Sequence, residues 1–134
     1  KGWGEFASVP LGVSIRIPPS MQANTSDDGV FLKTIANQRG RSIEEQWLGL
    51  SRYTHEREQD IYAHGRIQDP ESIRYTLNNR LLTGTTGKMN DANQKLFLLS
   101  IQENATSTYL VWAKTVDGVN EHTILDTLAT LSFR

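Results

Sequence analysis

Two neighbouring apolar runs in the C-terminal part of the chain constrain its fold most. They are KLFLLSIQ, residues 95–102, and STYLVWAKT, residues 107–115, and the short segment ENAT separates them. Runs of this length, joined by a connector this short, predict an antiparallel β-hairpin. In the first run, large apolar residues stand at consecutive positions and so fall on both faces of a strand. We therefore expect a central hairpin that is covered on both sides.

Further strands are predicted towards the N-terminus and in the middle of the chain. GWGEF (2–6) and GVFLKTIA (29–36) are two of them, and GVSIRIPP (12–19) is the clearest, because isoleucine and valine alternate with polar residues until the prolines end the run. NTSDDG (24–29) has turn-forming composition. The threonine-rich region 73–88 predicts a strand or an irregular hairpin.

The segment RSIEEQWLGLSRYTHEREQDIYAHG, residues 41–65, is interpreted as a long helix. Ser42 and Glu45 match a capping box at its start, and Gly65 is placed to end it. At the helical period, five side chains fall on one apolar stripe: Ile43, Trp47, Leu50, Thr54 and Ile61. We therefore expect this helix to pack on a sheet and to expose its charged residues.

The chain is expected to close with a short helix. Asn120 is a suitable N-cap, Glu121 suits the first turn, and four apolar residues follow at helical spacing: Ile124, Leu125, Leu128 and Leu131. The whole order predicts one α+β domain over residues 1–134. In it, a mostly antiparallel sheet packs against a long central helix and a short C-terminal helix.

Composition excludes several classes of function. The chain has 134 residues, a formal net charge of −1 and no cysteine. Thiol catalysis and thiolate metal sites are thereby excluded, and no strong positive field favours nucleic acid. No apolar run is long enough to cross a bilayer. The chain starts at Lys1, from which we expect a trimmed, exported chain that is periplasmic or secreted, with a lipid anchor possible upstream and a cytoplasmic location as the alternative.

The histidines and carboxylates of the predicted helix are the strongest candidates for chemistry. His55 and His64 are nine residues apart, so a continuous helix puts them on opposite faces, and neither has a second histidine at the spacing of HExxH. A solvated helix face is the favoured interpretation. A hydrolase that uses His55 or His64 is the alternative, and no metal, cofactor or catalytic residue is assigned.

Other patterns are weaker. GTTGKMN (84–90) falls two residues short of a phosphate-binding loop and lacks its hydroxyl residue, so a strand or turn is favoured. Arg39 and Arg41 could hold an anion before a helix but are interpreted as solubilising. Trp47 and Trp112 are expected in the core.

Three phrases of the sequence resemble the Mog1/PsbP-like superfamily, which includes DcrB-like and type VI secretion effector-chaperone domains. They are LGVSIRIPPSM (11–21), SIEEQWLGL (42–50) and YLVWAKTVDGVNEHTILDTLATLSF (109–133). The likeness is one of pattern and provides no site residues. It implies the fold of that superfamily and a non-enzymatic binding or assembly protein, an accessory protein of a bacterial cell envelope or secretion system. A cytosolic chaperone or immunity-type partner of a secreted effector is the second hypothesis, and in both the partner is another protein.

Overall fold

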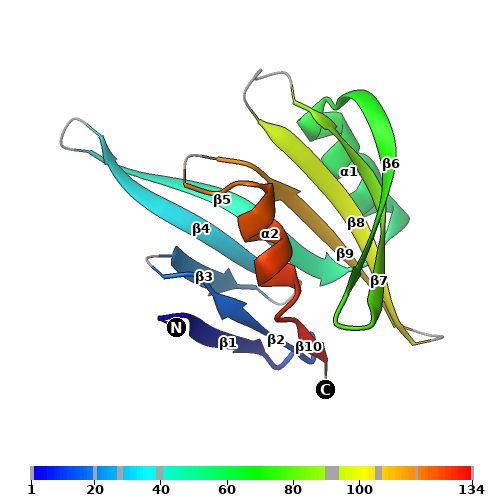
Figure 1. Cartoon of the computed structure of the whole chain (residues 1–134), viewed down its shortest axis with the longest axis horizontal. Coiled ribbons are helices and arrows are strands. Elements are labelled where there is room, and N and C mark those ends of the chain that lie inside the picture. Colours follow the sequence, from blue (N-terminus) through cyan, green and yellow to red (C-terminus); the bar gives the residue numbers. More distant parts are fainter. Residues whose placement is uncertain are drawn as a thin grey trace.

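The computed structural model describes residues 2–19, 21–26, 29–38, 41–89, 94–104, 107–116 and 118–133, without the side chains of 35–38, 41–43 and 104. Over these residues the chain forms ten strands and two helices (Figure 1). The strands are β1 (Gly4–Ser8), β2 (Val13–Ile17), β3 (Met21–Thr25), β4 (Gly29–Gln38), β5 (Arg41–Arg52), β6 (Gln68–Leu77), β7 (Arg80–Lys88), β8 (Lys95–Asn104), β9 (Ser107–Lys114) and β10 (Ser132–Phe133). The helices are α1 (His55–Gly65) and α2 (Glu121–Leu128).

Seven strands form one antiparallel sheet in the order β3-β4-β5-β9-β8-β7-β6. The predicted hairpin of β8 and β9 is confirmed and lies at the centre of this sheet. All four residues from Leu96 to Leu99 are buried, as expected for a strand covered on both faces. The predicted hairpin in region 73–88 is also confirmed as β6 and β7, which turn at Asn78 and Asn79, both with positive φ.

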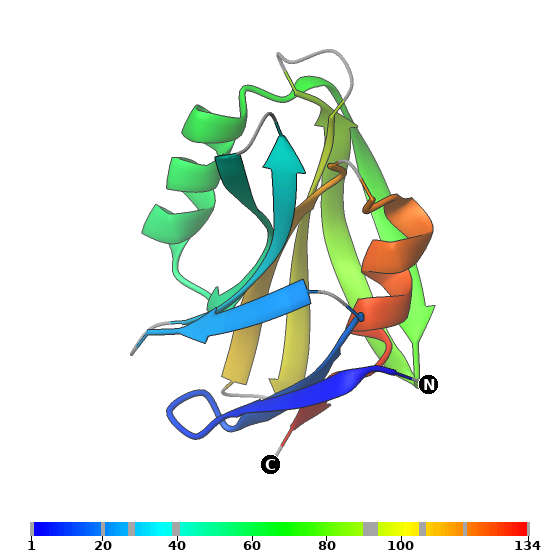
Figure 2. The same ribbon diagram turned by 90° about the vertical axis from the view of Figure 1, so that its left-hand side faces the viewer.

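The main core lies on one face of the large sheet. There α2 and a small sheet, ordered β1-β2-β10, cover β5, β8 and β9. The predicted C-terminal helix is confirmed, and the Asn120 side chain accepts a hydrogen bond from the Thr123 amide as its N-cap. Helix α1 lies on the opposite side of the large sheet (Figure 2). The sheet is therefore covered by a different helix on each face.

The α+β prediction with a long central helix is wrong. The described residues are mostly β, and strand β5 takes the place of the first half of the predicted helix. Ser42 and Glu45 are not a capping box, because both belong to this strand. Helix α1 begins only at His55, and its real N-cap is Thr54, whose hydroxyl accepts a hydrogen bond from the Arg57 amide at 3.1 Å.

A β-bulge at Trp47 explains the wrong assignment. Lys33 pairs with Gln46 and Leu32 pairs with Leu48, so Trp47 is an extra residue in β5. Trp47, Leu48 and Leu50 are all buried. The bulge places consecutive large residues in the core and so breaks the alternation of apolar and polar residues that identifies a strand. The spacing of the apolar residues then fits a helix as well. Strands β3 and β10 were also not predicted.

Replacing Thr54 by alanine is expected to lower the free energy of unfolding by about 1 kcal/mol. The change removes the acceptor for the Arg57 amide at the start of α1. Urea unfolding followed by circular dichroism measures the loss, and Thr54→Ser, which keeps the hydroxyl, is the matched control. A stability equal to wild type in Thr54→Ala would contradict this cap.

Candidate functional site

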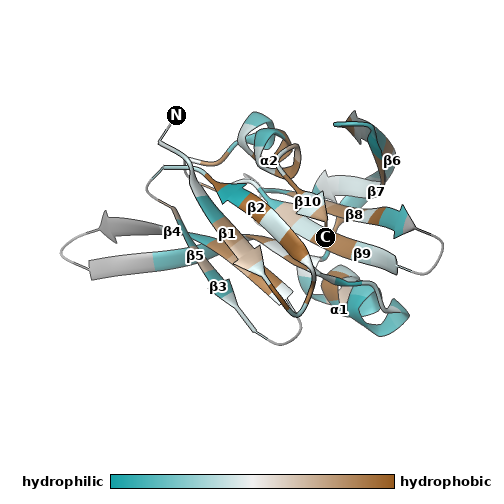
Figure 3. Cartoon of the chain, turned by 90° about the horizontal axis from the view of Figure 1, so that it is seen from below, coloured by the Kyte–Doolittle hydropathy of each residue, from teal (hydrophilic) through white to brown (hydrophobic). Residues whose placement is uncertain are grey.

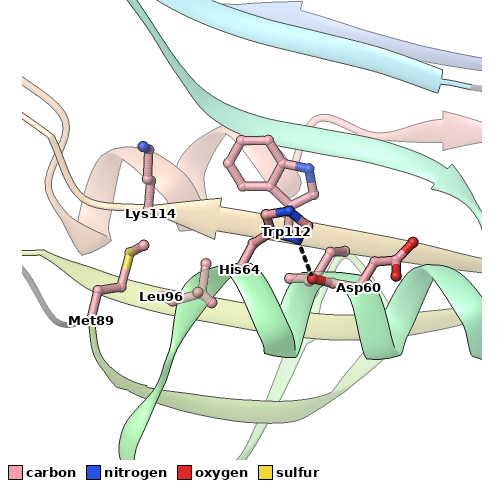
Figure 4. Close-up of a pocket in the computed structure, with 8 residues that line it drawn as sticks. Asp60, His64, Met89, Leu96, Trp112 and Lys114 are labelled. Atoms are coloured by element: carbon pink, nitrogen blue, oxygen red, sulfur yellow. Dashed lines mark hydrogen bonds between the residues drawn. The ribbon is translucent and has the colours of Figure 1, made fainter.

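A groove of about 340 Å³ lies between α1 and the sheet strands β8 and β9 (Figure 4). Helix α1 forms one wall, β8 and β9 form the floor, and Met89, just after β7, closes one end. The lining atoms are mostly apolar. The lining residues are Asp60, Ile61, His64, Gly65, Met89, Leu96, Trp112 and Lys114.

Trp112 forms part of the floor because of the glycine beside it. Gly49 of β5 is paired with Trp112 of β9, and a Cβ at Gly49 would lie 2.1 Å from the Trp112 Nε1. The indole therefore lies against the backbone of β5, in space that only glycine leaves. Trp112 was predicted to be a core residue, but its side chain is half-buried and lines the groove instead.

The wall formed by α1 is held close to the sheet by two contacts. A Cβ at Gly65 would lie 2.5 Å from the Leu96 Cδ2, so glycine allows the end of α1 to approach β8. The Tyr62 hydroxyl donates a hydrogen bond to the Thr85 Oγ1 of β7 at 2.9 Å. Helix α1 therefore lies close to β8 and is bonded to β7.

Charged and polar side chains line part of the groove. The Lys114 ammonium contacts the Glu45 carboxylate at 3.3 Å, and the Gln94 amide donates to the same carboxylate oxygen at 3.0 Å. On α1, the His64 Nδ1 lies 2.8 Å from the Asp60 carbonyl oxygen, so this nitrogen carries the proton of the bond. The Asp60 carboxylate points away from the His64 ring in Figure 4.

The structure does not bring together the histidines singled out in the sequence. His55 opens α1 and His64 lies in its last turn, and both are exposed. Within the described part of the chain, no group of three His, Cys, Asp or Glu side chains is placed to hold a metal ion. His122 pairs with Asp126 at 3.4 Å on the exposed side of α2. The hydrolase alternative has one histidine near the groove and stays a prediction.

The weaker sequence patterns have varied outcomes. Residues 84–88 of the glycine-containing stretch belong to β7, as the strand interpretation predicted, whereas Asn90 lies outside the described residues. Arg39 is outside them too. Arg41 does not precede a helix, as the anion-site idea required, but belongs to β5. Trp47 is fully buried, as predicted.

The groove was not predicted from the sequence, although one pattern indicated part of it. Within β9, alternation puts Tyr109, Val111 and Ala113 on the core face and Trp112 on the opposite face with Lys114. An aromatic residue on the face that also carries a lysine is better placed to line a surface groove than to fill a core. Asp60, Met89 and Leu96 could not be assigned to the site without knowing where α1 lies.

Compared with known protein families and with curated proteins, the sequence matches none. The resemblance to the Mog1/PsbP-like superfamily therefore stays a prediction, and the α+β architecture attached to it is corrected above. Neither described helix has the length and hydropathy needed to cross a bilayer.

Proposed function

We propose that this chain is a non-enzymatic protein-binding module, and that the groove beside α1 takes an apolar side chain of a partner protein. The observation that carries the proposal is the half-buried Trp112 at the floor of a mostly apolar groove. Aromatic residues and methionine are enriched at the centres of protein interfaces, where they bury large areas at low entropic cost. Trp112 and Met89 give the groove both residue types.

The arrangement around the groove supports a protein partner. The Lys114–Glu45 ion pair and the exposed Asp60 and His64 surround an apolar floor, which is the usual order of a polar rim around an interface core. A volume of about 340 Å³ is at the small end for a site that encloses a whole organic ligand. It suits one or two apolar side chains presented by a larger molecule.

The location of the protein in the cell does not bear on the groove. The expected periplasmic, envelope or secretion context, the lipoprotein interpretation and the chaperone alternative come from the sequence alone, and they stay predictions. The groove supports an apolar side chain on the partner.

A displayed library of random peptides, selected on the immobilised protein, tests the groove. We expect enriched peptides to share an aliphatic or aromatic anchor. Replacing Trp112 by alanine should weaken the binding of such a peptide about 10- to 100-fold, because a central aromatic residue typically contributes that much at an interface. Isothermal titration calorimetry of one synthetic peptide measures the change.

The control is Leu81→Ala, which trims a half-exposed apolar residue beside a different hollow lined by Thr83, Ser100, Gln102 and Thr108. This variant should bind the peptide as wild type does. Failure to enrich any peptide, or equal affinity in Trp112→Ala, would refute the groove as the binding site.

A further inference from the structure

Among the described strands, β6 is the longest that lies at the edge of a sheet. It has ten residues, whereas the other edge strands, β1, β3 and β10, have five, five and two. Within the described part of the chain β6 pairs with β7 alone, and Figure 3 shows it at the outer margin of the molecule. Natural proteins shorten or block edge strands, because an open edge pairs readily with another strand. A long edge strand is therefore a candidate binding surface.

The hairpin of β6 with β7 decides which backbone groups of β6 point outward. A two-residue turn joins Leu77 to Arg80, so these two residues form the closing pair and exchange both of their backbone hydrogen bonds. Bonded and non-bonded pairs alternate from there, so residues 75 and 73 also bond to β7. The residues whose amide and carbonyl groups point away from β7 are Ser72, Arg74 and Thr76.

The start of this edge is blocked, whereas its end is open. Pro70 has no amide hydrogen to donate, and a β-bulge interrupts the pairing with β7 between Gln68 and Glu71. Prolines and bulges are two of the devices that protect an edge from unwanted pairing. The stretch from Glu71 to Leu77 contains neither of them.

The side chains of the open stretch suit an added strand. Ile73, Tyr75 and Leu77 pack against the main core but are only partly buried. A strand beside β6 would place apolar residues next to this row and bury more of it. On the opposite face, Arg74 is exposed and has no carboxylate partner among the residues that the structure describes.

We propose that the edge of β6 binds an extended segment of a partner protein, with a carboxylate opposite Arg74 and an apolar residue on each side of that carboxylate. The segment adds a strand to the sheet, and its backbone bonds to the outward groups of Ser72, Arg74 and Thr76. Its apolar residues lie beside Ile73 and Tyr75, since side chains alternate between the two faces. Opposite charges at facing positions stabilise the pairing. The groove has no lining residue from β6, so the two binding sites are tested separately.

A second copy of the chain suits this edge less well. If two β6 strands paired antiparallel about a two-fold axis, each register would be centred on one residue. Centring on Arg74 would place the two guanidinium groups face to face. Centring on Ile73 or Tyr75 would make them diagonal neighbours on one face, about 7–8 Å apart. Like charges this close repel each other, whereas a carboxylate in the partner removes the conflict.

Amide hydrogen exchange, followed by NMR spectroscopy, tests the strand addition. The probe is a capped five-residue peptide with threonine at both ends, glutamate in the middle and valine on each side of it. In the free protein, the outward amides of Ser72, Arg74 and Thr76 should exchange at least tenfold faster than those of Ile73 and Tyr75, which bond to β7. Millimolar peptide should slow the outward amides at least threefold. Unchanged exchange at up to about 10 mM peptide would overturn the proposal.

The charge of the central peptide residue tests the predicted chemistry of the partner. A matched peptide with lysine in place of glutamate should bind to the wild type about fivefold more weakly, because it places a second cation opposite Arg74. Arg74→Glu should reverse this preference. Arg16→Glu makes the same change of charge on an exposed residue of β2 and should keep the wild-type preference. Equal affinity of the two peptides for the wild type would overturn the predicted carboxylate.

Thr76→Pro tests the edge itself. The amide of Thr76 points away from β7, so the change removes no bond of the hairpin but blocks the added strand. Binding of the glutamate peptide should weaken at least tenfold, and a thermal melt checks that the fold is retained. Undiminished binding would place the peptide elsewhere. If the outward amides slow as the concentration of protein alone is raised, a second copy occupies the edge, and the proposed partner is wrong.

Discussion

Replacing Gly84 by alanine is expected to lower the free energy of unfolding by about 3 kcal/mol or more. Gly84 of β7 faces Leu99 of β8, and an alanine Cβ there would lie 1.9 Å from the Leu98 carbonyl oxygen. No real Cβ lies so close to a backbone atom, and the backbone cannot relieve the clash by a rotamer change as a long side chain can. Strands β7 and β8 must therefore separate locally. The melting temperature should fall by about 10 °C for a chain of this size.

Gly4→Ala is the matched control for this change. Gly4 also lies in a strand, but no atom comes within 4 Å of a Cβ built there. The melting temperature of Gly4→Ala should stay within about 2 °C of that of the wild type. If both variants melt alike, close approach at Gly84 is not what holds β7 against β8.

The strands with unbroken patterns could be predicted from the sequence. Strands β8 and β9 carry dense apolar runs on either side of a short connector, and β2 alternates cleanly between Val13 and Ile17. The start of α2 could also be predicted from Asn120, because an N-cap side chain bonds to a backbone amide only a few residues further along the chain. These features depend on local geometry, so local sequence is enough to find them.

The misread segment depends on contacts that are distant in sequence. The bulge at Trp47 lies next to Leu48, the first residue of β5 that pairs with β9, and β5 stays paired with β4 on both sides of it. Nothing in residues 41–52 by themselves distinguishes a bulged strand from a helix, because both place Trp47 and Leu50 on one side. Thr54, the true N-cap, was assigned to the apolar stripe for the same reason.

The groove, too, could be predicted from the sequence only in part. Trp112 could be placed on the face opposite the core by alternation in β9, but Gly49, which gives its indole room, lies 63 residues earlier in the chain (112 − 49). Sheet pairing brings the two together. The groove is thus a product of strand order, and a search for motifs along the chain could not find it.

Replacing Trp47 by alanine is expected to lower the free energy of unfolding by about 3–5 kcal/mol. Its side chain is fully buried between β5 and the residues that cover the core face, so the change leaves a large cavity. Chemical denaturation with guanidinium chloride measures the loss. Because Trp47 occupies the bulge, its removal should also loosen the local pairing of β4 with β5.

Trp47→Phe should cost much less than Trp47→Ala, for a reason beyond its size. The Trp47 Nε1 is buried and has no hydrogen-bond acceptor among the described residues. A buried donor without an acceptor costs about 1–3 kcal/mol, and phenylalanine removes it. This gain offsets part of the lost packing, so we expect a loss of less than about 2 kcal/mol. A loss as large as that of Trp47→Ala would mean that the indole N–H is satisfied in solution, for example by a buried water molecule.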